Sequence, residues 1–127
     1  MSTDLVKKLH YKGGKALLLN APETFAWTIE ASAELEQGAD FILLFARNAE
    51  EVEQWKDKAA AALAPGDSIL WLAYPKKSSK MKSDIHRDLL WDTFASHQLR
   101  PVSQVSLDET WSALRYRHED RVKKKST

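Results

Sequence analysis

The sequence predicts an α/β fold, a three-layer sandwich around a mostly parallel sheet of about five strands with an antiparallel edge at the C-terminus. Short apolar runs recur along the chain and are continuous rather than alternating, as in strands buried on both faces of a parallel sheet. Stretches with the apolar spacing of helices separate the first runs. The last two runs are joined by a short polar connection, which favours an antiparallel pairing.

Length and composition limit the classes of protein to consider. The 127 residues are expected to form one domain over 1–118, followed by a basic flexible tail over 119–127. Apolar residues make up 43% and charged residues 29%, as in ordinary soluble proteins. No run approaches the roughly 20 apolar residues of a membrane span, and no signal-peptide core is visible, so we expect a cytoplasmic protein. The absence of cysteine excludes disulfides and thiolate chemistry.

The first predicted strand covers residues 15–20, an apolar run bounded by Gly13-Gly14 and by Pro22. Residues 4–11 before it predict a short amphipathic helix or turn. Pro22 suits the first position of a short helix that ends near Trp27. Residues 28–38 remain open between helix and edge strand, because their Ala and Glu favour a helix while Thr28 and Ile29 suit a strand.

The second predicted strand, 40–46, leads into a well-defined helix. Asn48 is expected to cap this helix, with Glu50 and Glu51 in the first turn facing the positive end of the helix dipole. Apolar side chains then recur on one helix face, at positions 52, 55, 59, 62 and 63. Pro65-Gly66 is expected to end the helix.

Two further strands, one helix and a closing strand complete the prediction. A third strand covers 68–74 and is followed by a helix from Asp84 to about His97. That helix is expected to bury a set of apolar side chains, namely Ile85, Leu89, Leu90, Phe94 and Ala95. The two remaining strands, 102–106 and 112–117, flank the short connection 107–110 and are expected to pair with each other.

The loop after the third strand concentrates the groups that suit a ligand. Because the carboxyl ends of parallel strands meet at one edge, the segments after the three strands are expected to lie together there. Lysine ammonium groups, hydroxyls and the N–H groups of a helix starting near Asp84 would suit a phosphate or carboxylate. The alternative is a solvated lysine loop that keeps the protein soluble. The predicted ligand-binding residues are Asn20, Asn48, Lys76, Lys77, Ser78, Ser79, Lys80, His86 and Trp111.

The sequence indicates no catalytic residues, metal or cofactor. The four histidines have no metal-ligand spacing, and no G-x-S-x-G segment is present. His86 is the best acid–base candidate because it lies just inside the helix that faces the expected cleft; the alternative is a partly exposed helix residue. Of the five tryptophans, Trp55 and Trp71 fall at core positions, whereas Trp111 lies beside acidic residues and is kept as a functional candidate.

The charges are unevenly distributed, with acidic residues gathered in 21–67 and basic residues in 68–127. Such a division can produce a surface with one side that attracts anions. The basic loop and the tail would allow salt-dependent contacts with nucleic-acid phosphates. A net charge of only +1 and the lack of a recognition motif argue against nucleic acid as the main partner.

Four blocks of sequence carry a family resemblance. They are LVKKL at 5–9, LLNAP at 18–22, LWLAYPKKSS at 70–79 and DETWSAL at 108–114. Together they resemble the blocks of a family of small bacterial proteins of unknown function, over nearly the whole chain to about Arg117. The resemblance implies a bacterial, cytoplasmic, stand-alone domain, and it points to 75–79 and 108–112 as shared features.

A second resemblance is to the Rossmann-like methyltransferases. The segment APGDSILW at 64–71 is similar to a turn and strand in the second half of those enzymes, and the two closing strands would fit their antiparallel edge. After the first strand, where those enzymes place a glycine-rich cofactor loop, this chain has NAPETF at 20–25, without glycine. The resemblance implies a Rossmann-like scaffold, and the departure argues against active methyl transfer because side chains would block the close approach of backbone to cofactor.

We therefore predict a non-catalytic or regulatory domain that binds an anionic small molecule or partner at the basic loop 76–84. One alternative is a degenerate methyltransferase-like fold that retains a nucleotide-like ligand. The other is a weak nucleic-acid binder.

Overall fold

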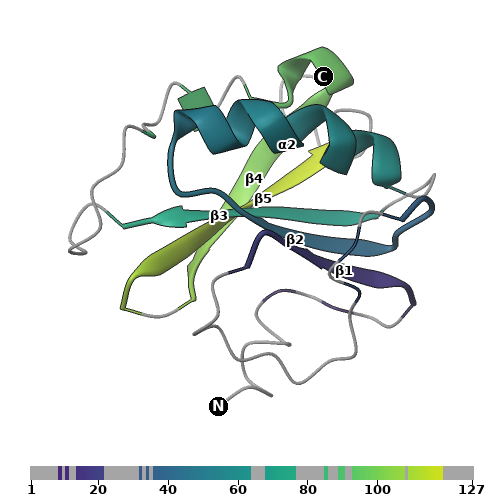
Figure 1. The fold of residues 1–127 in the computed structure, drawn as a ribbon, viewed down its shortest axis with the longest axis horizontal. Helices are drawn as coiled ribbons and strands as arrows, with labels where there is room; N and C mark the ends of the chain where they lie inside the picture. The colour runs from purple at the N-terminus through teal and green to yellow at the C-terminus, as the bar shows by residue number, and fades with distance from the viewer. Residues whose placement is uncertain are drawn as a thin grey trace, which may run out of the picture.

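A computed structural model describes residues 9, 11, 14–21, 32, 34, 36–63, 68–76, 85, 89–90, 93–107 and 109–118. Within them, β1 (Ala16–Leu19), β2 (Phe41–Phe45), β3 (Ile69–Pro75), β4 (Leu99–Ser106) and β5 (Trp111–His118) form one sheet in the order β1-β2-β3-β5-β4 (Figure 1). The first three strands pair in parallel, and β5 is antiparallel to both of its neighbours. β4 therefore runs in the same direction as β1, β2 and β3. The predicted sheet of about five strands, mostly parallel with an antiparallel edge at the C-terminus, is confirmed, and the sheet is mixed.

The parallel strands are short and apolar, as the sequence predicts. All five residues of β2 are buried, because β2 has a neighbouring strand on each side and packed side chains on each face. β3 ends one residue later than expected, at Pro75, which is in register with Trp111 of β5. Pro75 has no backbone N–H to donate. This costs no hydrogen bond to β2, because β2 ends at Phe45, which is in register with Ala73.

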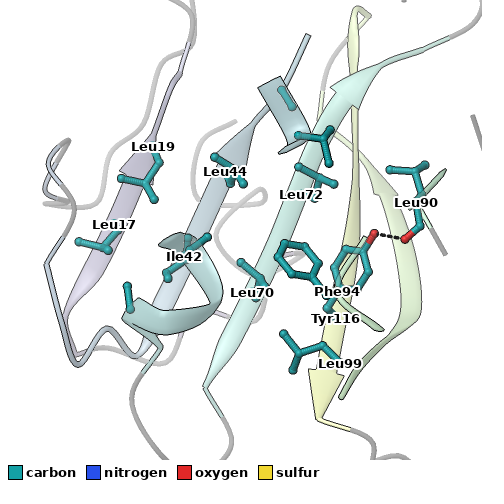
Figure 2. Close-up of a cluster of buried hydrophobic side chains, with 14 of the residues drawn as sticks. Leu17, Leu19, Ile42, Leu44, Leu70, Leu72, Leu90, Phe94, Leu99 and Tyr116 are labelled. Carbon is teal, nitrogen blue, oxygen red and sulfur yellow. Dashed lines mark hydrogen bonds between the residues drawn. The ribbon is translucent and has the colours of Figure 1, made fainter. Parts of the chain in front are cut away.

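Helix α2 (Ala49–Ala62) connects β2 to β3 and covers one face of the sheet (Figure 1). Asn48 caps it as predicted, and Val52, Ala59 and Ala62 are buried against the sheet. The helix packs on alternate residues of the strands together with side chains from the segment before β4, and Figure 2 labels ten residues of this cluster. The described part of the chain contains no helix long and apolar enough to cross a bilayer.

A second apolar cluster covers the opposite face of the sheet. It contains the other alternate residues of β1, β2, β3 and β5, together with Leu9 from the segment before β1. The indole N–H of Trp71 donates to the Leu9 carbonyl at 2.9 Å, which ties that segment to the middle of the sheet. Tyr11 packs edge-on against Phe41 with ring centroids 5.3 Å apart. The sheet is therefore the middle layer of the packed structure.

The predicted α-helix from Asp84 to His97 is wrong in its last turns. Residues 93–94 form a turn, and Ala95–His97 form a 3₁₀ helix, η1, which ends at Gln98 in the left-handed conformation. The carbonyl of Phe94 accepts from the N–H groups of both His97 and Leu99. This tight reversal starts β4 at Leu99, three residues before the predicted start. Leu89 and Leu90 are helical as predicted, Ile85 lies outside any helix, and the other residues of 84–92 lie outside the described residues.

In residues 28–38, for which the sequence allowed either a helix or an edge strand, Ser32 forms one β-bridge to the sheet. Ser32 lies parallel to Leu17, with Leu18 N–H donating to Ser32 and Ser32 N–H donating to Ala16. This bridge lies on the side of β1 opposite β2. The helix predicted over 22–27 and the tail at 119–127 lie outside the described residues, as does most of 4–11.

Candidate functional site

The carboxyl ends of β1, β2 and β3 lie at one edge of the sheet, as predicted from their parallel direction. Four of the predicted ligand-binding residues are described there: Asn20, Asn48, Lys76 and Trp111. The others lie outside the described residues and stay predictions, namely Lys77, Ser78, Ser79, Lys80 and His86. The described contacts divide this edge into two regions, one over β1 and β2 and the other over β3, β5 and β4.

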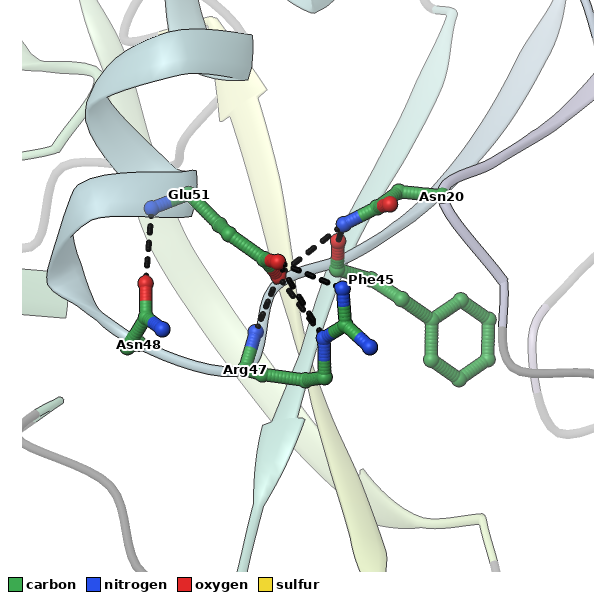
Figure 3. Close-up of polar contacts among 5 residues, drawn as sticks. All are labelled: Asn20, Phe45, Arg47, Asn48 and Glu51. Carbon is green, nitrogen blue, oxygen red and sulfur yellow. Dashed lines mark hydrogen bonds and ion pairs between the residues drawn. The ribbon is translucent and has the colours of Figure 1, made fainter.

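Glu51, in the first turn of α2, is the centre of the first region (Figure 3). Its carboxylate accepts from the Arg47 guanidinium, with Nη2 and Oε2 2.7 Å apart, and from the Arg47 backbone N–H at 2.8 Å. It also accepts from the Asn20 carboxamide at 3.1 Å. The Glu51 side chain is only 17% exposed, whereas that of Arg47 is 56% exposed.

These contacts determine the ionisation of Glu51. Hydrogen bonding to the Arg47 guanidinium is the main cause that holds the pKa of Glu51 below its ordinary value, against the opposing effect of burial. The same bond raises the pKa of Arg47. Glu51 is therefore an ionised carboxylate whose two oxygens are already supplied with donors. Such a group is a poor proton acceptor for chemistry on a ligand.

Asn20 follows β1 directly and has a left-handed backbone, with φ at 57°. If β1 continued, the ladder would direct the N–H of residue 21 at the carbonyl of Phe45. The Asn20 side chain takes that place instead, and its Nδ2 donates to the Phe45 carbonyl at 2.8 Å. Asparagine tolerates this backbone conformation better than most residues. Both contacts, to Phe45 and to Glu51, use the amide nitrogen of Asn20.

Asn48 also serves the protein's own backbone. Its Oδ1 accepts from the N–H of Glu51 at 2.9 Å, which is the helix cap that the sequence predicts. The described contacts of the two predicted ligand asparagines are thus structural. No sequence pattern indicated that Glu51 is the group that joins them. The spacing of Arg47 and Glu51, i and i+4 across the cap, was the one local signal for their ion pair.

Lys76 lies in the second region. Its ammonium donates to the hydroxyl of Ser106 at 2.6 Å, and its backbone N–H donates to the carbonyl of Thr110 at 2.8 Å. Among the described contacts, none joins Lys76 to Asn20 or Asn48. Within the described residues, β5 and β4 thus provide the partners of Lys76 on the far side of β3 from Asn20 and Asn48.

Trp111 belongs to the core. Its side chain is 3% exposed and packs edge-on against Phe45, with ring centroids 5.0 Å apart. The sequence makes Trp111 a functional candidate, and the structure places its side chain in the core, so it does not present its indole at the surface. Trp111 is the first residue of β5, and its side chain points to the same face of the sheet as Trp71 and Ala113.

No group of three or more His, Asp or Glu side chains that would hold a metal occurs within the described ranges.

Comparisons with known proteins identify the fold. No protein-family model matches the sequence, and no curated protein matches it. Among solved structures, a SAM-dependent methyltransferase from Aquifex aeolicus is similar with a TM-score of 0.56 and 11% identity, over 92% of this chain and 89% of that one. The fold is of the Rossmann-like methyltransferase type.

Two further solved structures support this assignment. LepI in complex with SAM has a TM-score of 0.52 and 13% identity, and a LepI variant in complex with SAH and a substrate analogue has a TM-score of 0.51 and 14% identity. The chain covers 39% of each of these longer chains. At this identity the likeness concerns the fold. The resemblance to a family of small bacterial proteins stays a prediction.

Proposed function

We propose that this protein binds a nucleotide-like ligand, of the S-adenosylmethionine class, at the carboxyl edge of β1 and β2. The observation that carries the proposal is the similarity of fold over 92% of this chain and 89% of the Aquifex aeolicus methyltransferase. In open α/β sheets, ligands bind outside the carboxyl ends of the strands. The parallel strands β1, β2 and β3 end together at such an edge.

The proposal is binding without methyl transfer. The segment after β1 has no glycine, and the Asn20 side chain occupies the space over the end of β2 through its bond to Phe45. A cofactor cannot approach the backbone there as closely as it would at a glycine. Glu51 is ionised and already bonded, so it is not suited to move protons during a reaction.

The direct test is a titration of the ¹⁵N-labelled protein with S-adenosylmethionine, S-adenosylhomocysteine and adenosine, followed by amide chemical shifts. We expect saturable shifts at residues 19–21 and 45–48, and an increase in melting temperature with ligand concentration. Absence of shifts at these amides at millimolar ligand would overturn the proposal. Release of S-adenosylhomocysteine with transfer of the methyl group to any acceptor would overturn the non-catalytic part.

A second candidate is an anionic small molecule bound at the loop 76–84. The observation in its favour is the position of Lys76, which brings a positive charge and a hydroxyl partner to the same edge of the sheet. The two candidates use different strands, so a parallel titration with a simple anion such as inorganic phosphate separates them by the residues whose amides shift.

A further inference from the structure

We draw no further inference here: the strongest candidate, the side-chain cluster of Asn20, Arg47 and Glu51 at the carboxyl edge of β1 and β2, belongs to the site already described, where its described contacts are structural.

Discussion

The carboxylate of Glu51 joins three segments that are separated in the sequence: the end of β1, the link after β2 and the first turn of α2. Its bonds to Asn20 and Arg47 satisfy groups that would otherwise need water at the end of the sheet. The arrangement also fixes the point where β1 leaves the sheet, since Asn20 bonds to Phe45 and to Glu51 with the same amide. At the scale of residues, internal bonds therefore hold the described part of this edge at the ends of β1 and β2.

Replacing Glu51 by glutamine tests the strength of this arrangement. The substitution removes the charge that pairs with Arg47 and keeps one acceptor oxygen, so we expect Glu51→Gln to lower the free energy of unfolding by about 1–2 kcal/mol at pH 7. The control is Glu53→Gln, because Glu53 is 61% exposed and pairs with Lys56 at 3.4 Å on the helix surface. We expect the control to change stability by less than about 0.5 kcal/mol in urea denaturation. Equal losses would contradict the special position of Glu51.

The pKa of Glu51 predicts how this difference depends on pH. Since folding lowers the pKa of Glu51, the folded state favours the ionised form, and the resulting stability is fully present above the ordinary value of 4.5. It is lost as the pH falls through the lower value of the folded state. The stability difference between the native protein and Glu51→Gln should therefore shrink on acidification below 4.5. A difference that stays constant between pH 7 and about pH 3 would reject this linkage.

Asn20 allows a test that separates backbone strain from hydrogen bonding. Asn20→Gly removes the side-chain bonds and keeps a residue suited to φ at 57°, whereas Asn20→Ala removes the same bonds and adds strain. We expect losses of about 1–2 kcal/mol for the glycine variant and about 1 kcal/mol more for the alanine variant. Thermal or urea unfolding measures both. A more stable alanine variant would contradict the left-handed conformation of residue 20.

At the scale of elements, α2 is held at both of its faces and at its start. Its apolar face packs on the sheet, and the His97 ring lies 2.8 Å from the carboxylate of Asp57, which links the exposed side of the helix to η1. The bond with His97 is the main cause that lowers the pKa of Asp57. The start of the helix depends on the side chain of Asn48.

Asn48→Ala is expected to lower stability by about 1 kcal/mol, because the N–H of Glu51 loses its acceptor. Asn48→Ser should recover most of this loss, since serine is also a favourable N-cap. The measurement is urea denaturation followed by circular dichroism. Equal stability of the serine and alanine variants would show that capping is not the reason for the effect.

At the scale of the whole molecule, the sheet separates two apolar clusters, one on each of its faces. Trp71 and Leu72 are neighbours in β3 yet belong to different clusters. On the α2 side, the buried hydroxyl of Tyr116 donates to Leu90 at 2.6 Å and its ring packs against Phe94, which fastens the segment before β4 (Figure 2). Burial is the main cause that raises the pKa of Tyr116.

Trp71→Phe tests the packing of the second face. The substitution leaves a cavity and leaves the Leu9 carbonyl without the indole N–H, so we expect a loss of about 2–3 kcal/mol and faster hydrogen exchange on that face of the sheet. Tyr11→Leu, which alters a contact nearer the surface, is the control and should cost less. A loss below about 0.5 kcal/mol for Trp71→Phe would contradict the role of Leu9 as part of the core.

For the described residues of the candidate edge, the location was predictable from the sequence and, apart from the cap formed by Asn48, the individual contacts were not. Parallel strands place residues 20, 48 and 76 at one edge, so their common location followed from strand direction alone. The bonds made by Asn20 were not predictable, because Glu51 lies 31 residues away and no local pattern indicates the contact. The inward direction of Trp111 depends on where β5 begins, and a shift of one residue would reverse it.

By itself, the sequence determined the number and type of most elements: five short strands, a capped helix between the second and third, and a closing antiparallel pair. These features depend on periodicity, caps and loop length, which act between near neighbours. Only the tertiary structure decided that β5 lies between β3 and β4, that the chain reverses at Phe94, and that Lys76 joins Ser106 rather than Asn20. Those outcomes depend on contacts between distant segments, and their free energies appear only when the sheet is assembled.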